Sequence, residues 1–333
     1  MISKRSRQIA LLLGLFSSLF LLYSVQSVAQ TGYPTRAINI VVPFAAGGPT
    51  DTVARVIAQA MSKPMGGGQL IVENKAGAGG TIAAEYVAKA APDGYTLLLH
   101  HIGMSTAPAL YRTLRYNAVD SFEPIGLIAD VPMTLVGKPG LAARDFKEFL
   151  AYIKANKATV TYANAGIGSA SHLCGMLFMS AIETDVTTVP YKGTGPAMND
   201  LLGGQVDFMC DQTTNTTSQI RGGKIKAYGV TTKTRVPSLK EIPTLEEQGL
   251  KGFEVAVWHG LYAPKGTPKA VIDKLVASLQ EALKDPTVKT RFNDLGTDPV
   301  SSDRATPAAL GAYLKAEIAK WTPLIKKAGV YAD

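Results

Sequence analysis

Apolar and polar residues alternate along this chain in blocks that predict a regular succession of strands and helices. The β-branched run 38–42 predicts a buried strand, the glycines after it predict a tight turn, and apolar residues at helical spacing over 52–61 predict a helix. Similar strand–turn–helix units recur over 70–100 and, after an extended stretch, over 145–231. This order is typical of an α/β fold with largely parallel strands.

Two long extended segments, 124–136 and 253–263, interrupt this order, and helices predicted over 267–283 and 307–325 close the chain. The simplest arrangement is two α/β lobes that these segments join as crossings, with a hinge and a cleft between the lobes. The predicted boundaries are residues 30–130 plus 257–333 for the first lobe and 131–256 for the second.

The first 29 residues have the pattern of an export signal. Lys4, Arg5 and Arg7 precede an apolar stretch over 9–25, and a small-residue cleavage site ends at Ala29. We expect a signal peptide cleaved after about Ala29 and an exported protein; a single uncleaved membrane anchor is the alternative.

Removing the three positive charges of this leader lowers the formal net charge from +8 to +5. That excess is spread along the chain without a basic, aromatic-rich helix, so we expect no nucleic-acid binding.

The chain has two cysteines and no Cys/His spacing typical of a metal site, and we expect neither a metal nor a cofactor. Cys174 lies early in a predicted helix, and Cys210 ends a predicted strand that could pack beside that helix. An oxidising compartment favours a disulfide between them, and two buried free thiols are the alternative.

Glycine with serine or threonine recurs where predicted helices begin, as in Gly47-Gly48, Gly168-Ser169 and Gly193-Thr194. Backbone N–H groups and hydroxyls at such positions suit a carboxylate without a buried counter-charge. Ser169 and His172 could form the nucleophile pair of an exported hydrolase, but capping of the helix by Ser169 or Ser171 is the favoured interpretation. The chain lacks paired catalytic carboxylates, so the pattern favours binding over catalysis.

Seven consecutive runs carry a family resemblance: 33–38, 40–55 (including Pro43-Phe-Ala-Ala-Gly-Gly-Pro-Thr-Asp51), 72–80, 91–97, 189–193, 197–207 and 263–266. They resemble the Bug family, the periplasmic solute-binding proteins of the tripartite tricarboxylate transporter type. The resemblance covers essentially the whole chain after the leader. It implies a two-lobed periplasmic-binding-protein (Venus flytrap) fold, which closes on a small organic acid and delivers it to the membrane permease components of a transporter.

The resemblance also implies where the ligand lies. In such proteins, first-lobe loops hold one carboxylate largely through backbone groups and waters, and second-lobe loops contact the remainder of the ligand. Asp211, where the family often has an acidic residue, could accept from an amino or hydroxyl group of the ligand or cap the following helix. The implied ligand residues are Phe44, Ala46, Gly47, Asp51, Asn74, Gly79, Gly80, Gly168, Ser169, His172, Tyr191, Gly193, Thr194 and Asp211. Ser105 is a further candidate from the sequence itself, because it lies in a predicted polar loop, 101–106, at the carboxyl end of a strand, where open α/β sheets bind ligands.

Two runs, 101–104 and 210–213, are bulkier or more unusual than the family's sequences, so the resemblance does not identify the ligand. Phe44, Met104 and Trp258 could form apolar walls for an aromatic or long aliphatic acid, although Trp258 suits core packing equally. We predict a monomeric periplasmic binding protein for a small mono- or dicarboxylate, aromatic acids included, with no enzymatic activity. The alternatives are the hydrolase and a ligand sensor that presents its closed form to a membrane receptor.

Overall fold

The computed structural model describes residues 32–329 and 331–332, and the residues from Arg36 onward form one compact unit. The predicted signal peptide and its cleavage site lie outside the described residues. Within the described part of the chain, no helix combines the length and apolarity that a membrane span needs.

Ten strands, counted over the described residues, join in one sheet in the order β2–β1–β3–β9–β4–β7–β5–β6, and β8 and β10 pair with β4 beside this path. One parallel set is β1 (Ile38–Val42), β2 (Leu70–Asn74) and β3 (Thr96–His101). A second parallel set is β5 (Thr161–Asn164), β6 (Thr187–Pro190) and β7 (Phe208–Gln212). The other strands are β4 (Phe122–Gly137), β8 (Lys226–Val230), β9 (Ala256–Pro264) and β10 (Asp298–Pro299).

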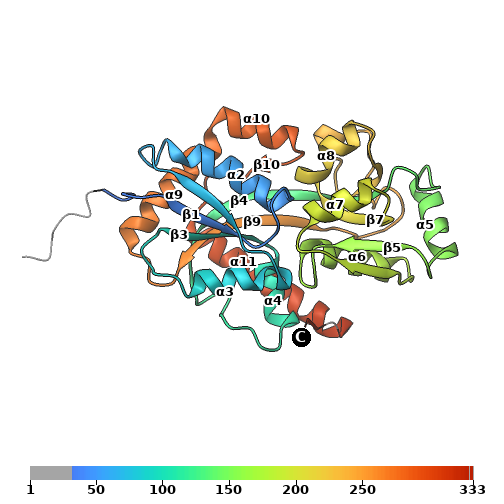
Figure 1. Ribbon diagram of the computed structural model, residues 1–333, viewed down its shortest axis with the longest axis horizontal. Coiled ribbons are helices and arrows are strands. Elements are labelled where there is room, and N and C mark those ends of the chain that lie inside the picture. Colours follow the sequence, from blue (N-terminus) through green and yellow to red (C-terminus); the bar gives the residue numbers. More distant parts are fainter. Residues whose placement is uncertain (1–31, 330, 333) are drawn as a thin grey trace, which may run out of the picture. The chain divides into compact units, whose positions relative to one another are not determined.

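The long strands β4 and β9 run side by side between the two parallel sets (Figure 1). Residues 122–132 of β4 pair with β9, and residues 133–137 pair with β7 and β8. This confirms the predicted two-lobed α/β fold with two extended crossings. We call the β1–β3 set with its helices the first lobe, and the β5–β7 set with its helices the second lobe. The exact residue boundaries of the lobes stay a prediction.

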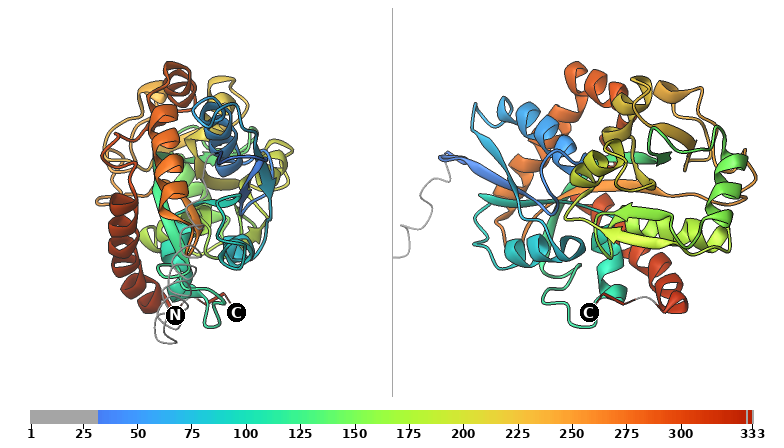
Figure 2. Two further views of the ribbon diagram at one scale, coloured as in Figure 1. Left: turned by 90° about the vertical axis from the view of Figure 1, so that its left-hand side faces the viewer. Right: turned by 45° about the vertical axis from the view of Figure 1, so that its right-hand side comes forward.

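Helices flank both parallel sets, and their buried faces follow the apolar stripes of the sequence. Helix α11 lies against α4 and β4 (Figure 2), and α9 packs against α2. The first lobe has α2 (Pro49–Ser62), α3 (Thr81–Ala88), α4 (Gly103–Leu110), α9 (Lys269–Lys284), α10 (Pro286–Asp294), α11 (Pro307–Ala328) and the 3-10 turn η1 (Ala78–Gly80). The second lobe has α5 (Phe146–Ala155), α6 (Ala170–Ala181), α7 (Thr194–Leu202), α8 (Thr213–Arg221) and the 3-10 turn η2 (Pro237–Leu239).

Two helices differ from the sequence prediction. Residues 101–106 were expected to form a polar loop, but α4 begins within them at Gly103. Gly103 and Pro108 disfavour a helix locally, and burial of Met104 and Leu110 overrides that preference. Helix α10 was missed, although Asp285, whose side chain accepts from the Thr287 N–H, and the proline after it are a helix-start signal.

Candidate functional site

Four helices begin at one small cavity between the lobes. Helices α2, α6, α7 and α8 each follow the carboxyl end of a strand, which is where open α/β sheets bind ligands. Their N-termini carry partial positive charge, and none of the lining residues is a lysine or arginine. The lining comprises Phe44, Pro49, Thr50 and His101 of the first lobe, and Ala165, Ser169, Ala170, Ser171, Thr194, Asp211 and Gln212 of the second.

The lobes lie in a closed arrangement around this cavity. The Ala45 N–H donates to the Lys192 carbonyl at 2.9 Å, and the Thr106 hydroxyl donates to the Gly168 carbonyl at 3.2 Å. The cavity between the lobes has a free volume of about 10 Å³, about enough for one water molecule. A small organic acid therefore needs the two walls to move apart.

Glycines allow the backbones of the two lobes to touch. A Cβ atom at Gly79 would lie 2.1 Å from the Ile167 carbonyl oxygen, and one at Gly193 would lie 2.9 Å from the Ala45 nitrogen. Both residues have positive φ angles, 58° and 155°, that L side chains rarely adopt. At these two predicted ligand positions the structure shows glycine serving the close approach of the lobes.

Asp51 lies in the first lobe, in a network that fixes the turn before α2. Its carboxylate accepts from the Gly47 N–H at 3.0 Å, Arg55 Nε at 2.9 Å and Asn74 Nδ2 at 2.9 Å. Asn74 also donates to the Phe44 carbonyl at 2.9 Å. Burial alone would raise the pKa of Asp51, but these hydrogen bonds outweigh it and hold the pKa below its usual 3.8. Asp51 and Asn74 do not line the cavity; they hold the turn that places Phe44 there.

Asp211 is the counterpart in the second lobe, and it lines the cavity at the end of β7. Its carboxylate accepts from the Gln212 N–H at 2.8 Å and Asn215 Nδ2 at 2.6 Å, and the Thr194 hydroxyl is a further partner. All three donors are neutral, so burial dominates and raises the pKa of Asp211 to about 6. The neighbouring Gln212 Oε1 is buried without a hydrogen-bond partner. One wall of the cavity is therefore rich in acceptors.

Ser169 and His172 do not form a catalytic pair. Ser169 Oγ accepts from the His172 backbone N–H at 3.2 Å, which caps α6, and it shares a hydrogen bond with Ser171 Oγ at 3.1 Å. His172 Nδ1 accepts from the Gly168 N–H at 3.5 Å, and burial lowers the pKa of the ring. This geometry agrees with the capping interpretation of Ser169.

A disulfide joins Cys174 of α6 to Cys210 of β7, with the Cα atoms 6.1 Å apart. Ser169 caps the start of α6, and Asp211 directly follows Cys210 in β7. The bond therefore ties together the two elements that carry the second-lobe wall of the cavity.

The other predicted ligand residues do not line the cavity. The Gly47 N–H donates to Asp51, and the Ala46 carbonyl lies against Gly195. Gly80 abuts the His100 ring, Ser105 Oγ donates to the Ile102 carbonyl, and the Gly168 carbonyl accepts from Thr106. Tyr191 donates to Asp200 at 2.6 Å and, with Gly79, lines a neighbouring cavity of about 280 Å³. Ligand contacts by these residues stay a prediction.

Of the three proposed apolar walls, only Phe44 lines the cavity. Met104 is fully buried, and Trp258 donates to Glu317 at 3.3 Å and packs edge-on against Tyr313. Sequence reasoning did not select His101, which stacks on Phe44 with ring centroids 4.7 Å apart. Its place at the end of β3, beside the other strand ends, is the signal that could have found it.

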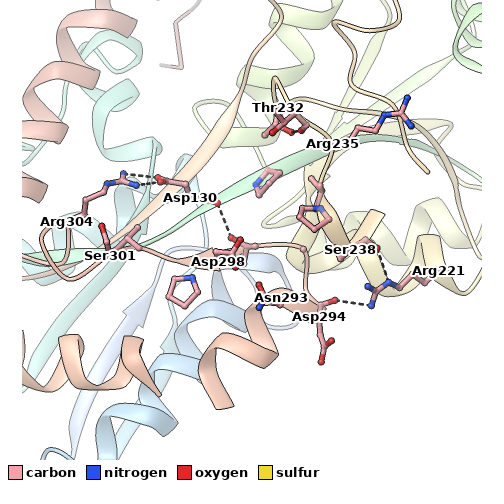
Figure 3. Close-up of a pocket in the computed structure, with 18 residues that line it drawn as sticks. Asp130, Arg221, Thr232, Arg235, Ser238, Asn293, Asp294, Asp298, Ser301 and Arg304 are labelled. Atoms are coloured by element: carbon pink, nitrogen blue, oxygen red, sulfur yellow. Dashed lines mark hydrogen bonds and ion pairs between the residues drawn. The ribbon is translucent and has the colours of Figure 1, made fainter. Parts of the chain in front are cut away.

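A larger cavity of about 690 Å³ lies between η2, β10 and the end of α10 (Figure 3). Its three arginines already have partners, and Arg235 pairs with Glu247. Arg304 pairs with Asp130, and Arg221 donates to the Ser238 carbonyl at 3.2 Å and to the Asp294 carbonyl at 3.5 Å. None of the predicted ligand residues lines it, and we therefore place the candidate site at the smaller cavity.

No group of three histidine, cysteine or acidic side chains in the described residues is arranged to hold a metal ion. The cavity instead has hydroxyls, helix N-termini and one carboxylate, which form a binding surface. Two α/β lobes joined by two crossings, with a closed cavity where four helices begin, define a solute-binding protein of the periplasmic type.

The chain belongs to the family described as the tripartite tricarboxylate transporter family receptor (TctC), whose model matches residues 53–330. This is a family of periplasmic substrate-binding proteins and not of enzymes. A relative from Agrobacterium vitis, "UPF0065 protein in the TAR-I ttuE-ttuC' intergenic region", is 52% identical over 301 residues, which are 90% of this chain and 87% of the relative.

Solved structures agree with this assignment. The periplasmic binding protein BugD is 55% identical with a TM-score of 0.88, covering 90% of this chain and 99% of BugD. MatC from Rhodopseudomonas palustris, solved with bound malate, is 41% identical with a TM-score of 0.85, covering 88% of this chain and all of MatC (100%). A protein from R. palustris solved with adipate is 33% identical with a TM-score of 0.85, covering 90% and 99% of the two chains.

Proposed function

We propose that this protein captures a small organic carboxylate in the cavity between its lobes and delivers it to the membrane permease of a tripartite tricarboxylate-type transporter. The observation that carries the proposal is the convergence of four helix N-termini on a cavity lined by no lysine or arginine. Backbone N–H groups and hydroxyls there can hold a carboxylate without a buried counter-charge. MatC, with its bound malate, gives independent support.

The acceptor-rich wall narrows the ligand class. The unpartnered Gln212 Oε1 needs a hydrogen-bond donor once water is excluded, because an unpaired buried acceptor is costly. The Asp211 carboxylate beside it can accept one more hydrogen bond in addition to its three. We therefore propose a carboxylate that also carries a hydroxyl or amino group. The small cavity favours an aliphatic acid over an aromatic one, although Phe44 offers one aromatic face.

Binding works by closure in this proposal. Ligand groups that reach both the Phe44 wall and the Ser169–Asp211 wall favour closure of the lobes around the ligand, with the walls farther apart than in this structure, since closure adds contacts only for a ligand that touches both lobes. Strands β4 and β9 bend to separate the walls. The closed protein then docks, as a monomer in the periplasm, on the permease.

The test is a thermal-shift screen of the chain from Gln30 onward, with calorimetry on each positive acid. The panel contains unsubstituted, hydroxy and amino dicarboxylates of four to six carbons, and aromatic acids. An acid at 100 times its Kd should stabilise the protein by about 2.7 kcal/mol, a clear rise in Tm. We expect hydroxy or amino acids to bind at least about tenfold more tightly than the unsubstituted acid of the same length.

Folded protein that binds none of these acids at millimolar concentration would contradict the proposal. Hydrolysis of activated esters that Ser169→Ala abolishes would instead support the hydrolase alternative.

A further inference from the structure

His101 belongs to the first-lobe lining of the cavity, together with Phe44, Pro49 and Thr50. It is 2% exposed, ends β3 and lines the cavity with Asp211 and Gln212 of the other lobe. Its ring stacks on Phe44 with an interplanar angle of 25°, and the edges of His100 and His259 lie with ring centroids 5.1 and 5.9 Å away. Contacts on several sides fix the position of this ring.

The hydrogen bonds of His101 also fix which ring nitrogen carries the proton. Nδ1 accepts from the Gly103 backbone N–H at 2.9 Å. A neutral imidazole has one donor and one acceptor, so an accepting Nδ1 leaves the proton on Nε2. The backbone turn from β3 into α4 therefore sets the tautomer.

The ring is neutral mainly because it is buried. Burial, together with the neighbouring His100 and His259 rings, holds the pKa of His101 well below its usual 6.5. Burial likewise lowers the pKa of His100 and of His259 to about 3. The three rings form a neutral cluster, and His101 is its only member that lines the cavity among the described residues.

We propose that His101 is a specificity residue that donates its Nε2–H to an oxygen of the bound ligand, opposite the acceptors Asp211 and Gln212. This inference rests on the proposed function. A neutral donor binds a ligand oxygen without adding a cation to the site. The donor on one wall and the acceptors on the other select a ligand with an oxygen acceptor at one position and an N–H or O–H donor at another.

Two substitutions separate donation from packing. His101→Phe keeps an aromatic ring against Phe44 and removes the donor, and we expect it to weaken binding of the best ligand roughly 10- to 100-fold. His101→Gln places an amide N–H near the position of Nε2, and we expect it to stay within about fivefold of wild type. His259→Gln is the matched control, since His259 belongs to the same cluster without lining the cavity, and the glutamine amide can keep its hydrogen bond with the Thr50 hydroxyl. It should leave the relative affinities for the panel of acids unchanged.

Selectivity distinguishes a ligand contact from a packing defect. A packing defect in His101→Phe would weaken the binding of every acid by a similar factor. Loss of the donor should instead reduce the differences in affinity between the acids. A second measurement needs no variant. In ¹⁵N-histidine NMR of the wild-type protein, the His101 signal should show the Nε2–H tautomer and shift on saturation with ligand.

The outcomes separate this inference from the proposed function. Wild-type protein that binds no carboxylate would overturn both. Tight wild-type binding with an unmoved Nε2–H signal, or with a His101→Phe variant of wild-type affinity and selectivity, would overturn the role of His101 alone.

Discussion

The two lobes each place one buried aspartate at a helix start beside the cavity, and the two carboxylates have opposite environments. Asp51 contacts Arg55 and is held ionised, with its pKa below 3.8. Asp211 has only neutral donors, and its pKa is raised to about 6. The first lobe uses its acid to brace a turn, whereas the second lobe leaves its acid open to the cavity.

The lobes also differ in how their cavity wall is held. The first-lobe wall depends on hydrogen bonds among Asp51, Arg55 and Asn74, and the second-lobe wall on the disulfide between Cys174 and Cys210. The disulfide can keep α6 and β7 in contact beside the buried carboxylate of Asp211, which has no counter-ion. The comparison predicts which substitutions affect stability and which affect ligand binding.

Removing the disulfide should have the largest effect on stability. The cysteines are 36 residues apart, so the loop-entropy model gives about 4 kcal/mol for the bond. We expect the double variant Cys174→Ala/Cys210→Ala to lose roughly 2–4 kcal/mol in urea denaturation. The reduced wild-type protein is the control and should lose a similar amount. Equal stabilities of the oxidised and reduced protein would contradict a bracing role.

Replacing Asp51 should have the next largest effect. Asp51→Ala breaks hydrogen bonds from Gly47, Arg55 and Asn74, and we expect it to destabilise the protein by about 2–3 kcal/mol. This is less than the loss of one partner of a fully buried ion pair would cost, because the Arg55 side chain is 54% exposed. Urea denaturation at pH 7 measures it, and Arg36→Ala, which removes an exposed ion pair with Asp93, is the control. A change below about 0.5 kcal/mol for Asp51→Ala would show that the network does not brace the turn.

Asp211→Asn should instead stabilise the protein, and only where Asp211 would be ionised. A folded-state pKa raised from 3.8 to about 6 means that the folded protein favours the protonated acid, so stability falls as pH rises from about 4 to about 6 and stays low above that. We expect Asp211→Asn to raise the free energy of unfolding by about 1–2 kcal/mol at pH 8 and to leave it unchanged at pH 4. The full shift of about two pKa units would give about 3 kcal/mol, and loss of the hydrogen bond with Asn215 reduces that gain.

The matched comparison for this prediction is Asp51→Asn. The Asp51 carboxyl of the wild-type protein has a lowered pKa. Its contribution to stability is therefore fully present above pH 3.8 and is lost only as the pH falls below that value. The stability difference between Asp51→Asn and wild type should therefore be constant from pH 8 to pH 5, while the Asp211→Asn difference shrinks over that range. Parallel pH profiles for the two variants would refute the comparison.

The smallest stability effect should come from the helix cap Ser169. Ser169→Ala removes the acceptor of the His172 N–H and should cost about 1 kcal/mol. Because Ser169 also lines the cavity, its loss should weaken ligand binding severalfold, measured by calorimetry. Thr306→Ala removes the corresponding cap of α11, away from the cavity, and should lower stability by a similar amount without changing affinity. Identical affinities in both variants would remove Ser169 from the site.

Sequence reasoning found the elements whose local signals agree with their burial. The β-branched run of β1 and the two long crossings are examples, because strand pattern and tertiary pairing favour the same structure there. It missed α4, where burial against α11 overrides Gly103 and Pro108. Local pattern cannot show which distant helix covers a weak segment.

The candidate site divides in the same way. Phe44, Ser169, Thr194 and Asp211 were predicted and do line the cavity, since they sit at strand ends and helix starts that the sequence marks. The strand end could have pointed to His101, but its proposed donor role needed the three-dimensional structure, because that role depends on stacking on Phe44 and on the Gly103 N–H. One signal in the sequence separates the two carboxylates: an arginine, Arg55, stands four residues after Asp51, where Asp211 has the neutral Asn215.

The most direct test of this account is a crystal structure of the protein with the acid that raises its Tm most. We predict that the ligand carboxylate lies among the N-termini of α2, α6, α7 and α8, with a hydroxyl or amino group of the ligand within hydrogen-bond distance of Asp211 or Gln212. A ligand bound in the cavity beside Arg221 and Arg304, or one that leaves both Asp211 and Gln212 without a new donor, would contradict it.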